Sequence, residues 1–335
     1  MRSLTFLILL VATPAWANDT AWGGTPGDLF PIQTSDVAMV EEHIVMRQNS
    51  NDWAWEVRVE FTFKNVGKKP VEITMGFPFY TYDPESPTTQ PKGTKDVKEN
   101  DPMVWDFTTQ VDGKSVTYEK QAVKANPAFP ELHYKWAYVW PTKFEPGQTV
   151  KVVNSYRQGI TQDSSGYIWP SYILRTGGMW HGGKIGRSHI EIFGDSESLP
   201  CQDESFFKIT PEKGTLKRKP EGPKWEWDLK DHTPTADVEA CFRSRDHIRN
   251  IMFYELEGTD YSKMSAAELR VLRNTVFALH GYEFKSDDLK KHFAKQWYYY
   301  PNKKFRNSDL TEDERVFVKA VQARERELSA SPTKP

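Results

Sequence analysis

Apolar and polar residues alternate along most of the chain between positions 37 and 245. The alternation is clearest in Trp53–Phe63 and is present more loosely in Thr149–Tyr156, a pattern typical of half-buried strands. Turn signals such as Asp112-Gly113 and Pro146-Gly147 separate the alternating runs. Short strands at this spacing predict an antiparallel β-sandwich, immunoglobulin-like or related, or two small sandwiches.

The same pattern predicts further strands along this region. They are Val71–Phe79, Val104–Val111, Val116–Val123, His133–Trp140, Tyr167–Leu174, His189–Phe193, Lys224–Leu229 and Val238–Arg243. Two polar, proline-bearing stretches, 81–102 and 211–224, are predicted to be loops.

Beyond residue 262 the apolar residues recur every three or four positions, which predicts helices. Ser265 and Glu268 form a capping box, and so do Thr311 and Glu314, while Ser286 precedes a third short apolar stripe. We expect a three-helix module over 261–328, with a frayed tail at 329–335, after a β region over 18–255. The fold class expected for the whole chain is α+β.

The first 17 residues, MRSLTFLILLVATPAWA, have the pattern of a secretory signal peptide. Arg2 supplies the basic start, a short apolar run follows, and Ala15-Trp16-Ala17 is a small-x-small cleavage site. No later run approaches 18 consecutive apolar residues, so no transmembrane segment is expected after cleavage. The sequence therefore predicts a soluble exported protein, periplasmic or extracellular.

Charge is distributed unevenly along the chain. Residues 260–335 carry 15 basic and 11 acidic side chains, whereas the whole chain carries 44 basic and 46 acidic ones. This asymmetry suggests two units with different partners. A nucleic-acid partner is not expected, because it would require a much denser basic face.

The chain has two cysteines, Cys201 and Cys241. In an oxidising compartment an even count indicates one disulfide. The alternative is two separate buried thiols. Two cysteines at this spacing do not make a zinc site.

The glycine-rich stretch Thr176–Arg187 has most of a phosphate-binding loop, but Ile185 follows Lys184 where serine or threonine is required. A turn between two strands is the favoured interpretation, and a ligand loop using Trp180 and His181 is the alternative.

The eight histidines form no HExxH pattern and no i, i+4 pair. His181 and His189 could meet only if a hairpin brought them together. The sequence predicts no metal site, no cofactor and no catalytic residue.

The stretch Arg273–Phe284 has the pattern of a helix end. Gly281 is placed to adopt the left-handed conformation that closes helices, so His280 would lie at the C-cap and interact with the helix dipole. Tyr282 would fold back on the helix. Arg273 and Asn274 are assigned structural roles, with Asn274 expected to bond to the following loop.

The residues from Leu269 to Asn302 resemble the YARHG domain, a small extracellular bacterial module, over about residues 261–305. The matching positions are Leu269, Leu272, Arg273, Asn274, Ala278, His280, Gly281, Tyr282, Phe284, Leu289, Phe293, Trp297, Tyr298 and Pro301. Phe277 and Leu279 stand where the family has tyrosine and arginine. The resemblance implies an exported protein with a module that is appended to varied partners.

Upstream, Met75–Pro78 and Tyr172–Trp180 resemble a secreted bacterial β-rich family. Together these features favour a non-enzymatic binding or structural protein of the cell envelope. In this hypothesis the helical module docks to peptidoglycan, an anionic surface polymer or an envelope protein. Candidate contacts are Trp297, Tyr298, Arg270 and Lys304, because exposed aromatic rings beside cations suit sugar polymers. The favoured interpretation of the aromatic rings themselves is that they pack in a small core of the module. The alternative is a hydrolase of an envelope polymer that uses carboxylate or histidine acid/base chemistry. The sequence does not determine the oligomeric state.

Overall fold

The structure is a computed structural model that describes residues 19–25, 29–79, 81–82, 88–99, 101–129, 132, 134–201, 210–211, 214–219 and 221–330. The predicted signal peptide and the last five residues of the predicted tail lie outside the described residues.

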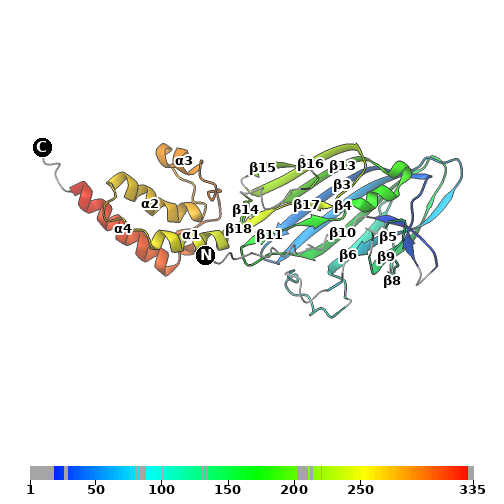
Figure 1. Ribbon diagram of the computed structural model, residues 1–335, viewed down its shortest axis with the longest axis horizontal. Coiled ribbons are helices and arrows are strands. Elements are labelled where there is room, and N and C mark those ends of the chain that lie inside the picture. The colour runs from blue at the N-terminus through cyan, green and yellow to red at the C-terminus, as the bar shows by residue number, and fades with distance from the viewer. Residues whose placement is uncertain are drawn as a thin grey trace, which may run out of the picture.

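Two main sheets form the β region (Figure 1). The larger has eight strands in the order β15-β16-β13-β3-β4-β10-β6-β7. Their bounds are Thr215–Lys219 (β15), Gly222–His232 (β16), Ile185–Phe193 (β13), Val37–Asn49 (β3), Ala54–Asn65 (β4), Thr149–Gly159 (β10), Val104–Val111 (β6) and Lys114–Ser115 (β7).

The smaller main sheet has five strands in the order β2-β1-β5-β9-β8. Their bounds are Phe30–Pro31 (β2), Thr20–Gly23 (β1), Val71–Phe79 (β5), Trp136–Phe144 (β9) and Glu119–Ala122 (β8). Two short sheets complete the region, β11-β18-β14 (Tyr167–Ile168, Phe242–Ser244, Ser198–Pro200) and β12-β17 (Ser171–Tyr172, Val238–Glu239).

One hydrophobic core joins the inner faces of the two main sheets. Phe63 of β4 packs against Phe144 of β9, and Phe77 of β5 packs against Tyr156 of β10. The predicted α+β class, with a β-sandwich region ahead of a helical module, is confirmed.

Every pairing between these strands is antiparallel except that of β3 with β13, which run parallel. Four strands of the larger sheet (β4, β6, β7 and β10) and three of the smaller one (β5, β8 and β9) lie between β3 and β13 in the chain, so the two strands are far apart in sequence. The parallel pair therefore places side by side residues whose proximity cannot be predicted from the local sequence pattern.

Part of the predicted loop at 211–224 is β15, an edge strand paired with β16. The glycine-rich stretch near residue 180 forms two short 3₁₀ turns, Arg175–Met179 and His181–Gly183, which lie between β12 and β13. It is a connection between strands, as predicted.

Four helices follow the β region and lie at one end of it (Figure 1). They are α1 (Arg245–Glu257), α2 (Ala266–Leu279), α3 (Asp287–Phe293) and α4 (Glu312–Ala330). A 3₁₀ turn, Asn307–Asp309, precedes α4. No helix among the described residues combines the length and apolar character needed to cross a membrane.

Helix α1 is an addition to the three helices expected from the sequence. Ser244 caps it, because its hydroxyl accepts the backbone N–H of His247. The helix begins directly after β18, inside the stretch that the sequence assigned to the β region. Its Ile248 packs with Leu199 of β14 and with residues of the helical module.

The predicted disulfide between Cys201 and Cys241 is present, with the two Cα atoms 5.7 Å apart. It ties the end of β14 to the residue that precedes β18. Because α1 follows β18 directly, the disulfide braces the segment that leads into the helices.

Candidate functional site

The outer side of the eight-stranded sheet carries rows of charged side chains. Successive side chains of a strand point to opposite faces, so each buried residue alternates with an outward one. In β4 the buried Val57, Val59 and Phe61 alternate with the outward Glu56, Arg58 and Glu60. We call this side, from β16 across to β6, the charged outer face.

In β3 an irregularity between Met39 and Glu41 shifts this alternation by one residue. Such a bulge changes the face to which the following side chains point. After it, Glu42 and Ile44 are buried, while Glu41 and His43 point outward.

A hollow of about 580 Å³ lies on the charged outer face. Strands β3, β4, β6 and β10 provide its walls. Its titratable and cationic lining residues are His43, Arg47, Glu56, Arg58, Glu60, Asp106, Tyr156 and Arg157. This volume is typical of pockets that bind small molecules.

Ion pairs hold the side chains at the rim of this hollow. Arg157 bonds to Asp52 and to Asp106, each with an N–O distance of 2.6 Å. Arg58 pairs with Glu60 at 3.0 Å, with both side chains about half exposed. Cations and carboxylates thus alternate along the lining of the hollow.

A second hollow of about 260 Å³ adjoins the first and shares His43 and Glu60 with it. It continues across the sheet to Arg187 and His189 of β13. His43 and Glu60 therefore lie where the two hollows meet.

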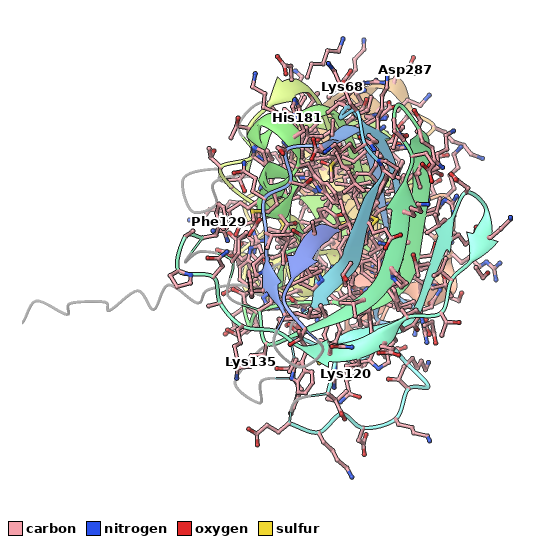
Figure 2. The ribbon with its side chains drawn as sticks, turned by 90° about the vertical axis from the view of Figure 1, so that its right-hand side faces the viewer. Lys68, Lys120, Phe129, Lys135, His181 and Asp287 are labelled. Atoms are coloured by element: carbon pink, nitrogen blue, oxygen red, sulfur yellow. A yellow bond between two sulfur atoms is a disulfide. The ribbon has the colours of Figure 1, made fainter. Side chains whose placement is uncertain are left out.

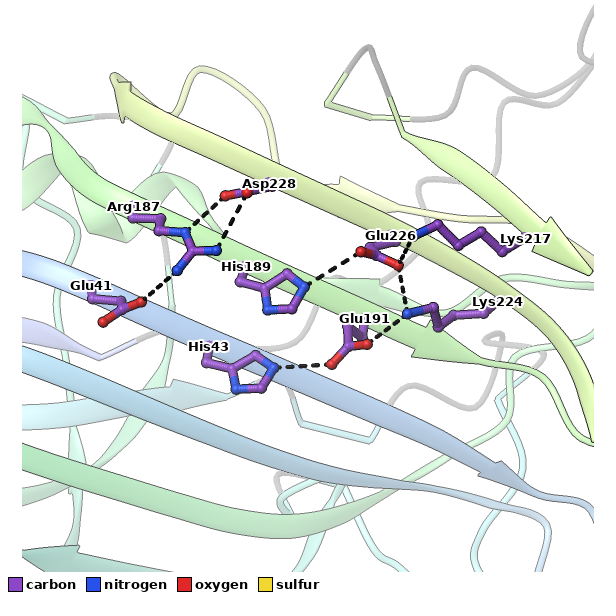
Figure 3. A network of polar contacts seen from close by, with 9 residues as sticks. All are labelled: Glu41, His43, Arg187, His189, Glu191, Lys217, Lys224, Glu226 and Asp228. Atoms are coloured by element: carbon purple, nitrogen blue, oxygen red, sulfur yellow. Dashed lines mark hydrogen bonds and ion pairs between the residues drawn. The ribbon is translucent and has the colours of Figure 1, made fainter. Parts of the chain in front are cut away.

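His43 and His189 lie directly opposite each other on the parallel strands β3 and β13. Their rings stack with centroids 4.7 Å apart and planes 9° apart, which matches the spacing of neighbouring strands. Figure 3 shows both rings among carboxylates on the outer side of the sheet. His43 Nε2 lies 3.1 Å from a carboxylate oxygen of Glu191, and His189 Nε2 lies 3.7 Å from one of Glu226.

Two lysines hold the carboxylates of this network. Lys224 donates to Glu191 at 2.7 Å and to Glu226 at 2.5 Å, and Lys217 donates to Glu226 at 2.6 Å. The hydrogen bonds from Lys217 and Lys224 lower the pKa of Glu226 to about 2. Burial opposes ionisation of Glu191, but the hydrogen bonds from Lys224 and His43 outweigh it and lower the pKa of this carboxyl.

At the other end of the network, Arg187 bonds to Asp228 at 2.9 Å and to Glu41 at 3.2 Å (Figure 3). The hydrogen bond from Arg187 lowers the pKa of Asp228. The carboxyl groups Glu191, Glu226 and Asp228 are thus all held as anions.

The structure separates the two residues of the predicted ligand loop from this network. Trp180 is fully buried against Phe63 and its indole nitrogen donates to the backbone oxygen of Asp19. It is a core residue, so its predicted contact with a ligand is wrong. His181 is exposed and its Nδ1 is bonded to the backbone oxygen of Ser35. Figure 2 shows it at the surface of the sandwich end remote from the helices, and the ring stacked with His189 is that of His43 instead.

The four candidate docking residues of the helical module do not form one platform. Tyr298 is buried, and its ring meets that of Trp297 edge-on at 82°. Arg243 of β18 lies over the Trp297 ring, 5.8 Å from its centroid, so this tryptophan borders the β region. Arg270 is paired with Asp288 of α3, whereas Lys304 is exposed.

The predicted helix end is present. Helix α2 ends at Leu279 with His280 at the C-cap, and Gly281 has a φ of +80°. The N–H of Gly281 donates to Ala278 and that of Tyr282 to Phe277, which are the two bonds of a Schellman motif.

His280 has a partner that local sequence does not reveal. Its Nε2 lies 3.0 Å from both carboxylate oxygens of Glu314, and both side chains are buried. The two predicted structural residues nearby also have specific partners. Arg273 of α2 bonds to Glu325 of α4 at 3.0 Å. Asn274 donates to the backbone oxygen of Arg270, one turn earlier, so its expected bond to the following loop is wrong.

The charged outer face could not be recognised from the sequence patterns described above. One signal was available: His189-Ile-Glu191 lies in an alternating run, which puts the histidine and the glutamate on one face of a strand. The contribution of His43 could not be found this way, because it requires the parallel pairing of β3 with β13.

Two family models match the chain. The YARHG domain matches residues 255–326, and the domain of unknown function DUF4424 matches residues 17–126. The resemblance that Leu269–Asn302 indicated is confirmed, and so is a second family in the β region. No curated protein matches the chain.

Among solved structures, the chain is similar to a Legionella pneumophila protein described as a putative nutrient binding protein. The two are 30% identical, with a TM-score of 0.69, over 91% of this chain and 99% of that one. An M1 zinc metallopeptidase from Deinococcus radiodurans is 8% identical over 64% of this chain and 43% of its own, with a TM-score of 0.33. Native leukotriene A4 hydrolase from Saccharomyces cerevisiae is 8% identical over 62% and 29%, with a TM-score of 0.36. These last two likenesses are too partial to indicate a shared function.

Proposed function

Because the chain belongs to the same family as the Legionella pneumophila protein, we propose that it is an exported, non-enzymatic binding protein. Its ligand site is the 580 Å³ hollow on the charged outer face. The ligand is a small zwitterion, such as a free amino acid or a short peptide. The observation that carries the proposal is the alternation of cations and carboxylates across the hollow.

The spacing of these charges suits a dipeptide. Outward residues of one strand lie two positions apart, or roughly 6.8 Å. Two extended residues of a peptide span about 7 Å. Glu56, Arg58 and Glu60 therefore offer a carboxylate to the ammonium group and a guanidinium to the carboxylate of one dipeptide.

These side chains are free to exchange partners. The pair between Arg58 and Glu60 is about half exposed, and exposed ion pairs contribute about 0–1 kcal/mol. A ligand carboxylate can replace Glu60 at Arg58 at little cost, because guanidinium binds carboxylates through two parallel hydrogen bonds.

The carboxyls of the network beside the hollow do not suit acid catalysis. A general acid needs a carboxyl with a raised pKa, whereas the pKa values of Glu191, Glu226 and Asp228 are lowered. These carboxylates remain ionised and are therefore suited to bind a cation.

Calorimetric titration of the full chain with alanyl-alanine tests this proposal. The same dipeptide with an acetylated N-terminus and an amidated C-terminus is the matched ligand control. We expect the zwitterion to bind, the blocked form to bind at least about tenfold more weakly, and Arg58→Gln to weaken the zwitterion. Lys64→Gln, at an exposed position of the same strand outside the hollow, should have no effect. Equal binding of both dipeptides, or no binding of either, would contradict the proposal.

We further propose that the helical module anchors the protein to peptidoglycan or an anionic surface polymer. The exposed Lys304, the part-exposed Trp297 and the basic balance of residues 260–335 support this role. Sedimentation of the full chain with purified peptidoglycan is the test. Lys304→Gln should reduce the bound fraction, whereas Lys64→Gln in the β region should leave it unchanged. An unchanged bound fraction for Lys304→Gln would rule out this docking face.

A further inference from the structure

We propose that His43, His189 and Glu191 bind a late first-row divalent metal ion of the Zn²⁺ class, with Glu226 as a fourth ligand. This site shares His43 with the lining of the proposed dipeptide hollow. It uses none of Glu56, Arg58 and Glu60, and metal binding by the isolated donors does not depend on the dipeptide. It also revises the expectation of no metal site, which rested on spacing within the sequence alone.

The geometry carries the proposal. One donor atom from each of His43, His189 and Glu191 lies within 4.8 Å of the other two. Ligands of a tetrahedral zinc ion at bond lengths of about 2.0–2.2 Å lie roughly 3.3–3.6 Å apart. Side-chain rotations that turn the stacked imidazoles toward a common point and close these separations would place the three donors around one ion. Figure 3 shows the histidines and the carboxylates pointing to the same side of the sheet.

The chemistry of the donors selects the class of ion. Two imidazoles with carboxylates suit zinc, copper and nickel, whereas magnesium and calcium take oxygen ligands almost throughout. The histidines are held on neighbouring central strands, β3 and β13, so their backbones are fixed by the sheet. Rigid strands of this kind preorganise a site.

The two carboxylates already have a cationic partner in this structure. Lys224 bonds to both Glu191 and Glu226 and its side chain is 9% exposed. A metal ion must therefore displace an ammonium group from the carboxylates. Removing that ammonium should tighten metal binding.

Titration of the metal-free full chain with Zn²⁺, followed by calorimetry, tests the proposal. Co²⁺ absorption serves as a second readout, because its visible bands report the ligand geometry. We expect His43→Ala and His189→Ala each to weaken Zn²⁺ binding on the order of 10- to 100-fold. Lys224→Gln should strengthen it on the order of tenfold.

His181→Ala is the control variant, because His181 is an exposed histidine that lies apart from the network. It should leave the affinity unchanged. Urea unfolding of each variant separates loss of metal binding from loss of fold. Zn²⁺ binding weaker than about 1 mM, or equal losses in His181→Ala and His43→Ala, would overturn the proposal. Weaker binding by Lys224→Gln in a folded protein would overturn the role of the lysine as competitor.

Discussion

At the scale of the residue, the pair between His280 and Glu314 links the two longest helices of the YARHG region. Glu314 is also the capping-box residue of α4, where it accepts the N–H of Thr311 at 2.7 Å. One buried carboxylate therefore accepts hydrogen bonds both from the start of α4 and from the residue that ends α2. Burial opposes its ionisation, but the hydrogen bonds from His280 and Thr311 outweigh burial and lower the pKa of Glu314.

Replacing Glu314 by alanine should destabilise the protein by on the order of 3 kcal/mol, because it leaves a buried imidazole without its partner. The loss in the free energy of unfolding caused by this substitution should depend on pH. A carboxyl whose pKa is lowered by folding stabilises the fold above its unfolded pKa of about 4.3 and loses this contribution as pH falls. Urea unfolding at pH 7 and at pH 3.5 measures the change. An equal effect of the substitution at both pH values would contradict it.

Asp19 is a buried carboxyl in the core of the sandwich. Asn154 donates to its Oδ1 at 2.7 Å, while its Oδ2 has no hydrogen-bond partner among the described residues. Burial raises the pKa of Asp19 well above its usual value, and the nearby Glu42 adds to this. Folding therefore favours the protonated form.

We expect Asp19→Asn to stabilise the protein at pH 7.5 by about 1–3 kcal/mol, since the amide avoids a buried charge and still accepts from Asn154. A carboxyl with a raised pKa destabilises the fold increasingly as pH rises above its unfolded value of about 3.9. The gain from Asp19→Asn should therefore shrink toward pH 4. Thermal unfolding across this range is the measurement, and a less stable variant at pH 7.5 would refute the explanation.

At the scale of the element, the end of α2 depends on one glycine. Gly281 adopts a positive φ, and a Cβ atom there would lie 2.4 Å from the backbone oxygen of Tyr300. Its position thus requires glycine both for backbone conformation and for the close approach of the segment that follows α3.

Gly281→Ala should destabilise the protein by about 1–3 kcal/mol from conformation alone, with a further loss from the contact with Tyr300. His292→Ala, at a half-buried position of α3, is a milder comparison in the same module. Urea unfolding of both variants provides the check. Equal stability of Gly281→Ala and the wild type would contradict this account of the helix end.

The local sequence pattern predicted those helices and strands whose ends are marked by residues within or next to them. Capping boxes located α2 and α4, glycine located the end of α2, and alternation located β5 and β6 at their observed bounds. Helix α1 was missed because a strand precedes it without a break, although Ser244 supplies a cap. Strand β15 was missed because glycine and proline surround it.

At the scale of the whole molecule, the neighbours of each strand decide where its outward side chains meet. Alternation predicts that His189 and Glu191 share a face, but it does not predict which strand lies beside them. The parallel pairing of β3 with β13 places His43 against His189. Because pairing between distant strands is fixed by the global packing of the core, the candidate site could not be assembled from sequence.

The two parts of the molecule are joined by packing as well as by the chain. Arg245 at the start of α1 is buried and donates to the backbone oxygen of Ser196, 2.8 Å away. Leu199 of β14 belongs to the same apolar cluster as Phe284 and Tyr300 of the helical module. The helical module is therefore seated on the end of the β region, while the charged outer face stays open for a ligand.

The most direct test of the central claim is to locate bound dipeptide on the isotopically labelled full chain by NMR. Titration with alanyl-alanine should shift the signals of His43, Arg58 and Arg157 on the charged outer face. The signals of Trp297 and Lys304 in the helical module should stay in place. Shifts confined to the helical module, or no shifts at saturating dipeptide, would contradict a ligand site on the outer face of the sheet.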